Sequence, residues 1–387
     1  MSIKNSKVIT LTQIGIIMII GVPKEIKNHE YRVGIIPSSV QELTTRNHQV
    51  IVETQAGAGI GFSDDDYKAV GATIVTSAEE VFDQAEMIVK VKEPQAIERK
   101  RLKSEHLLFT YLHLAPDAEQ TADLVESKAT CIAYETITST NGQLPLLVPM
   151  SEVAGRMSIQ AGAHCLEKTQ GGSGVLLGGV PGVKPAKVVI IGGGIVGSHA
   201  AQMAIGLGAD VTLLDNNLDS LRRLNQQFGS SAKLIHSNKN SLSEHVLTAD
   251  LVVGSVLIPG AAAPKLVTAE MIKQMKSGSA VVDVAIDQGG CFETSKATTH
   301  QEPTYIVDEV VHYCVANMPG AVARTSSQAL NNATLPYIVK LADNGWKKTL
   351  ANDKHFLNGL NVCDGKVTNQ AVAENLGYDF FSPDTFV

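Results

Sequence analysis

The first part of the chain alternates short apolar runs with segments of mixed polar and apolar residues. The apolar runs predict buried strands at 16–22, 49–53, 87–91, 107–111 and 130–133. The mixed segments between them predict helices near 38–46, 64–70, 77–83 and 116–127. Strands that alternate with helices favour a mostly parallel sheet covered on both faces, so we predict an α/β domain here.

The second part of the chain repeats this alternation after a helical stretch at 151–168. We predict six strands with helices between them, as a doubly wound fold requires, at 187–191, 210–214, 233–236, 251–255, 280–285 and 304–307. From residue 326 onward the pattern is helical (326–334, 336–346 and 369–376) and contains no predicted strand. We expect this tail to pack on the first domain.

The pattern therefore predicts an α/β protein with two Rossmann-like doubly wound domains and an interdomain cleft. The expected boundaries are an N-terminal extension at 1–17, a discontinuous substrate domain at 18–145 plus 320–387, and a dinucleotide-binding domain at 146–319. The apolar stretch at 14–22 is too short to span a bilayer, so we interpret it as leading into the first buried strand and expect no membrane association.

A glycine motif lies between two predicted strands of the second domain. Gly192, Gly194 and Gly197 follow an apolar run in G-x-G-x-x-G spacing, a small-residue helix comes next, and Asp215 ends the following strand. These glycines permit a tight turn, a close approach to a pyrophosphate and close packing of helix on strand. The motif predicts dinucleotide binding, with Asp215 on the ribose 2′-hydroxyl.

The residues around Asp215 favour NAD over NADP as the cofactor. A 2′-phosphate needs a cation where Asp215-Asn216-Asn217 stands, and Arg222 and Arg223 lie further along the chain.

Composition and charge exclude several other classes of protein. The chain has 387 residues, is 44% hydrophobic and 18% charged, and carries a net charge of −7, which argues against disorder and nucleic-acid binding. Its five cysteines are scattered without metal-ligand spacing, so we expect free thiols, no metal and a cytoplasmic location.

Ionisable residues end three of the apolar runs, where ligands bind in open α/β sheets. Lys92 and His113 do so in the first domain and Asp287 in the second, and Arg32 follows the first predicted strand. Each has an ordinary interpretation: a solvated lysine, a core histidine, a turn aspartate. Together they form a coherent set for binding and transforming a small polar substrate in the cleft.

At these residues the chain resembles the alanine dehydrogenase/pyridine nucleotide transhydrogenase family. The resemblance runs from about Met18 to the C-terminus and is carried by the stretches 21–33, 90–94, 110–115, 149–156, 177–182, 187–197, 283–291 and 314–319. The departures are the N-terminal extension and Gly193 within the glycine turn. Within this family the resemblance points to alanine dehydrogenase activity, the reversible NAD-dependent oxidative deamination of L-alanine to pyruvate and ammonium.

The resemblance also implies roles for individual residues. Arg32 binds the substrate carboxylate, Lys92 contacts the substrate and polarises its carbonyl or imine, and His113 is the general acid/base. Asp287 orders the attacking water or ammonia. Cofactor contacts beyond the glycines are implied at Ser151, Ile195, Val196, Asp215, Ser220, Val256, Leu257, Asp287 and Asn317. A homohexamer is implied as well.

Three other functions remain open at this stage, one of them that of a different amine-forming dehydrogenase of similar build. The NAD-binding subunit of a proton-translocating transhydrogenase shares the two-domain layout but has no use for an amino-acid site. A catalytically silent NAD-binding protein would not need the set formed by Arg32, Lys92, His113 and Asp287.

Overall fold

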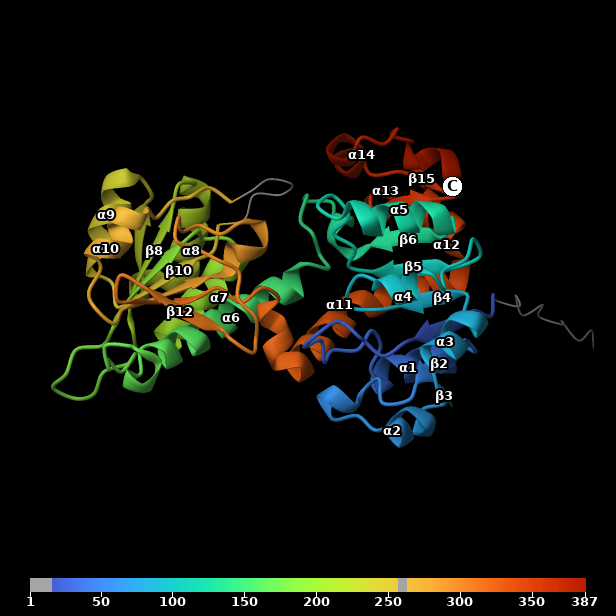
Figure 1. The fold of residues 1–387 in the computed structure, drawn as a ribbon, viewed down its shortest axis with the longest axis horizontal. Coiled ribbons are helices and arrows are strands. Elements are labelled where there is room, and N and C mark those ends of the chain that lie inside the picture. Colours follow the sequence, from blue (N-terminus) through green and yellow to red (C-terminus); the bar gives the residue numbers. More distant parts are fainter. Residues whose placement is uncertain (1–15, 257–262) are drawn as a thin grey trace, which may run out of the picture. The chain divides into compact units, whose positions relative to one another are not determined.

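The computed structural model describes residues 16–256 and 263–387, which form two compact units (Figure 1). Unit 1 holds the described residues up to Ile26 together with Val33–Gln143 and Asn331–Val387. Unit 2 holds Lys27–Arg32 and Leu144–Leu330. Two expectations fall outside the described residues: most of the N-terminal extension at 1–17, and the cofactor contact at Leu257.

Unit 1 contains an eight-stranded sheet in the order β15-β14-β6-β5-β4-β1-β2-β3. The strands are β1 (Ile19–Val22), β2 (Gln49–Glu53), β3 (Thr73–Val75), β4 (Met87–Val89), β5 (Leu107–Thr110), β6 (Thr130–Ala133), β14 (Leu360–Cys363) and β15 (Lys366–Val367). The first six are parallel, and their order 3-2-1-4-5-6 is that of a doubly wound nucleotide-binding sheet. Strand order therefore reverses at β1, between β2 and β4.

The helices of unit 1 begin at residues suited to that position. Pro37 occupies the first turn of α1, Ser63 and Asp66 form a capping box on α2, and Asp117 caps α5. The helices are α1 (Pro37–Thr45), α2 (Asp64–Ala69), α3 (Ala78–Gln84), α4 (Ala96–Arg99), α5 (Ala118–Ser127), α12 (Trp346–Ala351), α13 (Lys354–Leu357) and α14 (Gln370–Leu376). The chain returns from unit 2 to unit 1 within α11 (Ala323–Asn344).

The C-terminal tail differs from the sequence prediction in two ways. It contributes β14, which pairs antiparallel with β6, and β15, although no strand was predicted there. The helices predicted at 326–334 and 336–346 are one continuous helix, α11, with Pro336 inside it. A single proline removes one helical hydrogen bond, which surrounding tertiary packing outweighs here.

Unit 2 contains a seven-stranded sheet in the order β12-β13-β11-β10-β7-β8-β9. The strands are β7 (Lys187–Ile191), β8 (Asp210–Asp215), β9 (Lys233–His236), β10 (Leu251–Gly254), β11 (Ala280–Asp283), β12 (Thr304–Val307) and β13 (Val310–Tyr313). Six of these strands are parallel: β7, β8, β9, β10, β11 and β13. Numbered 1 to 6 along the chain, they lie in the sheet in the order 3-2-1-4-5-6. The confirmed fold class is thus mixed α/β with two mainly parallel sheets.

The prediction of β12 as the sixth parallel strand was wrong. β12 pairs antiparallel with β13, and β13 occupies the sixth position. Asp308 and Glu309 between them both have positive φ, 48° and 62°, which is the backbone of a tight two-residue hairpin turn.

Alternate residues of the central strand β7 enter different cores of unit 2. Val188 and Ile190 pack with residues of α6 (Val148–Cys165) and α7 (Ile195–Gly206). Val189 and Ile191 pack with residues of α9 (Lys239–Thr248) and α10 (Ala269–Gln274). This alternation places helices on both faces of the sheet, and α8 (Leu218–Phe228) packs beside β8 and β9. In the part of the chain that the structure describes, every helix is too short or too polar to cross a bilayer.

Candidate functional site

The glycine motif forms the turn between β7 and α7 in unit 2. Gly192 has a φ of +102°, and a Cβ on Gly197 would lie 1.8 Å from the Gly192 carbonyl oxygen, so neither position accommodates a side chain. Gly194 caps the N-terminus of α7, and a Cβ there would meet no atom within 4 Å. The positive end of α7 therefore opens onto free space, where backbone N–H groups can bind phosphate.

Asp215 lies at the end of β8, beside this turn. Its carboxylate accepts hydrogen bonds from the backbone N–H groups of Gly193 (2.6 Å) and Asn217 (2.7 Å). A Cβ on Gly193 would lie 2.6 Å from Leu224 and 3.0 Å from an Asp215 oxygen, which explains the extra glycine noted in the sequence. Arg223 lies on α8 as expected, but its guanidinium donates to the Gly193 carbonyl at 2.9 Å.

The strand order of unit 2 reverses between β7 and β10, the usual ligand-binding edge of such a sheet. Ser255, directly after β10, donates from its hydroxyl to the carbonyl oxygens of Ile191 and Gly192, each at 2.9 Å. The sequence analysis did not single out Ser255. It ties the glycine turn to the neighbouring strand.

The remaining predicted cofactor contacts in unit 2 are partly exposed residues at or near helix starts and strand ends. Ile195 and Val196 lie in the first turn of α7, Ser220 in the first turn of α8, Ser151 in α6, and Val256 just after β10.

Asp287 is an exposed residue of the short helix Val284–Gln288, which follows β11. The buried carboxylate of Asp283 holds this segment, because it accepts from the N–H groups of Ala285 and Cys291 at 3.1 and 2.8 Å and from the Ser295 hydroxyl. Burial raises the pKa of the Asp283 carboxyl, although these hydrogen bonds act in the opposite direction.

Arg32 belongs to unit 2, where its guanidinium is bound by Glu30 and Asn317. Its Nε and Nη2 donate to the two Glu30 oxygens at 2.7 and 2.6 Å, and Nη2 also donates to Asn317 Oδ1 at 2.8 Å. Asn317 Nδ2 in turn donates to Glu30 at 3.1 Å. The bidentate pair fixes the plane of the guanidinium, and Arg32 as a whole is only 3% exposed.

Lys92 follows β4 in unit 1, and a buried charge cluster supports its backbone. Glu25 accepts from the N–H groups of Val91 (2.7 Å) and Lys92 (3.2 Å), and also from the ammonium of Lys90 (3.0 Å). Lys90 is completely buried and donates to Glu98 as well, at 2.7 Å. Burial lowers the pKa of Lys90, but the two carboxylates outweigh it and the net pKa is raised.

His113 lies beyond β5 in unit 1, with its ring half exposed. Its backbone φ is +51°, and its N–H donates to the Glu135 carboxylate at 2.6 Å. The imidazole stacks on Tyr111 with ring centres 5.8 Å apart and planes at 6°. His113 Nδ1 lies 3.9 Å from Glu135.

The structure thus groups the predicted residues within each unit. In unit 2, Arg32 contacts Asn317 directly, and Asp215 at the end of β8 is hydrogen-bonded to Gly193 in the glycine turn. The carboxylates that support these residues were not predicted from the sequence: Glu25, Glu30 and Glu135. Applying the strand-end rule to the run at 130–133 would have found Glu135. Among the described residues, no group of histidine, cysteine, aspartate or glutamate is arranged to hold a metal ion.

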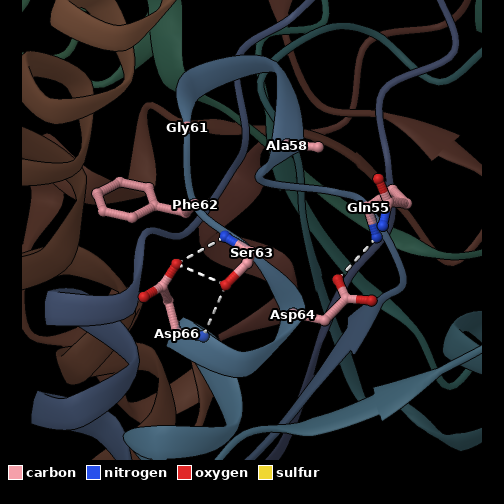
Figure 2. A pocket seen from close by; sticks show the side chains of 7 residues that line it. All are labelled: Gln55, Ala58, Gly61, Phe62, Ser63, Asp64 and Asp66. Carbon is pink, nitrogen blue, oxygen red and sulfur yellow. Dashed lines mark hydrogen bonds between the residues drawn. The ribbon is translucent and has the colours of Figure 1, made fainter.

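A pocket of about 310 Å³ in unit 1 has none of these residues in its lining. Figure 2 shows its lining between Gln55 and the start of α2. Its polar groups already serve local structure: Ser63 and Asp66 form the capping box, and Asp64 accepts from the Gln55 N–H at 2.8 Å. We therefore do not assign this pocket to the functional site.

Comparison with known proteins gives matches over nearly the whole chain. The models "Alanine dehydrogenase/PNT, N-terminal domain" and "Alanine dehydrogenase/PNT, C-terminal domain" match residues 21–154 and 158–370. An alanine dehydrogenase from Halomonas elongata is 61% identical over 363 residues, which cover 94% of this chain and 98% of that protein.

Solved structures agree with these matches. A structure of L-alanine dehydrogenase superposes with a TM-score of 0.91 at 54% identity, covering 93% of this chain and 99% of that one. A transhydrogenase from Sinorhizobium meliloti superposes with a TM-score of 0.80 at 24% identity, covering 90% of this chain and 100% of that one. At that identity the second match shows a shared fold only.

Proposed function

The chain belongs to the alanine dehydrogenase/PNT family, and we propose that it catalyses the reversible NAD-dependent oxidative deamination of L-alanine to pyruvate and ammonium. One observation carries this proposal: the chain is 61% identical to an alanine dehydrogenase across 98% of that protein's length. The family uses pyridine nucleotides, and the choice of NAD is our proposal.

The geometry of unit 2 supports NAD binding. The open space at Gly194 and the N-terminus of α7 suit a pyrophosphate, and Asp215 suits a ribose hydroxyl. Further contacts are proposed at Ser151, Ile195, Val196, Ser220, Val256, Leu257, Asp287 and Asn317. When bound, NAD would supply the acceptor for the hydride that leaves the alanine Cα.

We assign the substrate carboxylate to Arg32. A guanidinium suits a carboxylate because its planar fork donates paired hydrogen bonds, and Glu30 and Asn317 hold that plane in a fixed orientation. The substrate carboxylate would therefore meet an Arg32 guanidinium whose orientation is already fixed. Lys92 contacts the substrate and polarises its carbonyl or imine.

His113 and Asp287 handle protons and water. Oxidation of alanine leaves an imine, which water attacks to give a carbinolamine that breaks down to pyruvate and ammonium. His113 transfers the protons in these steps, since an imidazole can both accept and donate a proton. Asp287, itself exposed, orders the water and stabilises the cationic iminium.

The test is the rise in NADH absorbance when the purified protein is given L-alanine and NAD⁺ at alkaline pH, followed by a panel of other amino acids. We expect a rise with L-alanine. A folded protein that binds NAD but shows no alanine-dependent rise would refute the enzyme assignment and leave a silent NAD-binding protein or a transhydrogenase subunit.

We also propose a homohexamer, which the family resemblance supports. Light scattering on the purified protein should then give about six times the chain mass of 41.1 kDa. A mass of one or two chains would contradict this assembly without affecting the proposed chemistry.

A further inference from the structure

We propose that Glu135 is a positioning residue for the reaction, because its carboxylate holds the backbone of His113 in a conformation that the chain would not adopt unaided. The inference rests on the proposed function, in which His113 is the general acid/base. Glu135 itself acts through His113 and contacts no reacting atom in this assignment.

The sheet topology brings the two residues together. β5 and β6 are parallel neighbours, with Thr110 opposite Ala133 in the register. His113 lies three residues beyond Thr110, and Glu135 lies two residues beyond Ala133, in the short helix Tyr134–Thr136. Both segments therefore leave the same edge of the sheet side by side.

The hydrogen bonds run from backbone to carboxylate. Glu135 Oε1 accepts from the N–H of His113 at 2.6 Å, and both Glu135 oxygens lie 3.2 Å from the N–H of Leu112. A single carboxylate thus binds two consecutive amides of the turn. The side chain of Glu135 is only 11% exposed, so solvent competes weakly for it.

The turn needs this support because of its backbone geometry. His113 has a φ of +51°, in the left-handed region that side-chain-bearing residues adopt at a cost. Its side chain is 48% exposed, and Tyr111 stacks on its ring. Two consecutive N–H groups bound to one carboxylate offset the cost of this conformation.

The contact with the imidazole itself is weaker. Nδ1 lies 3.9 Å from Glu135 Oε1, beyond the reach of a direct hydrogen bond. The geometry therefore assigns Glu135 to the backbone of His113 rather than to its ring. A proton-transfer group displaced by about 1 Å loses up to about 100-fold in rate, so this backbone anchor has a measurable consequence.

The experiment compares Glu135→Ala with Glu135→Gln in the full-length protein. Alanine removes both acceptors. Of the two carboxylate oxygens, only Oε1 is within hydrogen-bond distance of both N–H groups. Glutamine keeps an oxygen at the position of Oε1 but removes the negative charge. The matched control is Glu126→Ala, an exposed glutamate on α5 of the same unit.

We expect Glu135→Ala to lower kcat about 10- to 100-fold with the Kd for NADH unchanged, and Glu135→Gln and Glu126→Ala to stay within about threefold of the wild type. Hydrogen exchange of the peptide that contains Leu112 and His113 should be faster in Glu135→Ala only. The exchange measurement does not depend on activity, so it tests the anchor even if alanine is not the substrate.

Three outcomes would overturn the inference. One is a folded Glu135→Ala protein with wild-type kcat, and another is unchanged hydrogen exchange at the turn. The third is a Glu135→Gln protein as slow as Glu135→Ala, which would assign the effect to charge. An inactive wild type would instead refute the proposed function and leave the exchange result to decide on the anchor.

Discussion

The amide of Gly193 donates a 2.6 Å hydrogen bond to the carboxylate of Asp215, joining the ends of neighbouring strands β7 and β8. The other Asp215 oxygen accepts from the Asn217 amide at 2.7 Å. Two backbone donors therefore fix this negative charge beside the glycine turn. A ligand that enters the turn meets the charge in a defined position.

This fixed charge predicts a preference for NAD, because a 2′-phosphate would be repelled by Asp215. We expect the wild-type kcat/KM with NAD⁺ to exceed that with NADP⁺ by about 100-fold or more. Asp215→Ala should lower this ratio of the two kcat/KM values by about tenfold, which corresponds to about 1.4 kcal/mol of discrimination between the cofactors. Initial rates at varied cofactor concentration measure both. Equal use of the two cofactors by the wild type would contradict the prediction.

Substitutions at two glycines of the motif should have different effects, one on the stability of the fold and the other on cofactor binding. A Cβ at Gly197 collides with the Gly192 carbonyl, whereas a Cβ at Gly194 meets nothing within 4 Å. We expect Gly197→Ala to destabilise the protein, and Gly194→Ala to fold normally but bind NADH at least about tenfold more weakly. Calorimetry measures the loss of stability in Gly197→Ala, and NADH fluorescence measures the weaker cofactor binding of Gly194→Ala.

The control for this comparison is Gly206→Ala, at the other end of the same helix, where a Cβ also meets nothing within 4 Å. It should bind NADH as the wild type does. If Gly194→Ala also binds normally, the N-terminus of α7 is not the pyrophosphate site.

The fold class could be predicted because local patterns determine most of it. The apolar runs and the motif from β7 to β8 specify parallel strands with crossover helices, and both sheets have this form. β3 escaped detection because it is a short edge strand with only one buried residue, whereas β4 is equally short but buried throughout. β14 could not be predicted from its own residues, since its pairing with β6 joins segments far apart in the sequence.

The candidate site could be predicted in part. The rule that ligands bind beyond strand ends selected Lys92, His113 and Asp287, and their chemical roles remain predictions. The supporting carboxylates were harder to find, because Glu25 lies 67 residues before Lys92 and Glu135 lies 22 residues after His113. The positive φ of His113 depends on such contacts and leaves no mark in the sequence.

The Glu30–Arg32 pair should make stability depend on pH. Burial alone would raise the pKa of the Glu30 carboxyl, but the hydrogen bonds and charge of Arg32 hold it below its ordinary value of 4.5. A pKa lowered on folding stabilises the native state above the unfolded pKa, and this stabilisation is lost as pH falls through the folded pKa. The native state should therefore be weakened progressively below pH 4.5.

Glu30→Gln tests this dependence. We expect the variant to be less stable than the wild type at pH 7 by about 3 kcal/mol, because it removes the charge of the buried carboxylate that pairs with the Arg32 guanidinium. The difference should shrink as pH falls below about 4.5, and denaturant unfolding at a series of pH values measures it. The exposed control Glu302→Gln should show neither effect, and a difference independent of pH would contradict the assignment to the Glu30 charge.

Lys90 should contribute strongly to the stability of unit 1. Lys90→Met would leave Glu25 and Glu98 buried without their common cation, so we expect a loss of about 3–5 kcal/mol in the free energy of unfolding. Lys103→Met is the matched control: its ion pair with Asp83 is exposed, and exposed pairs contribute little. Equal stability of the two variants would show that the Lys90 cluster is not a stabilising contact.

Replacement of His113 tests its role as the general acid/base. We expect His113→Ala to lower turnover by about 10²–10⁴ without loss of NADH binding, since the glycine turn lies in the other unit. Because His113 has a φ of +51°, His113→Asn is the better-matched variant: asparagine adopts the left-handed region more readily, so the turn keeps its shape while the imidazole is lost.

Stopped-flow measurement of NADH formation compares both with His164→Ala, which removes an exposed histidine on α6 and should leave the rate unchanged. A slow His113→Ala protein with a normal His113→Asn protein would assign the loss to the backbone, and an unchanged rate in both would remove His113 from proton transfer altogether.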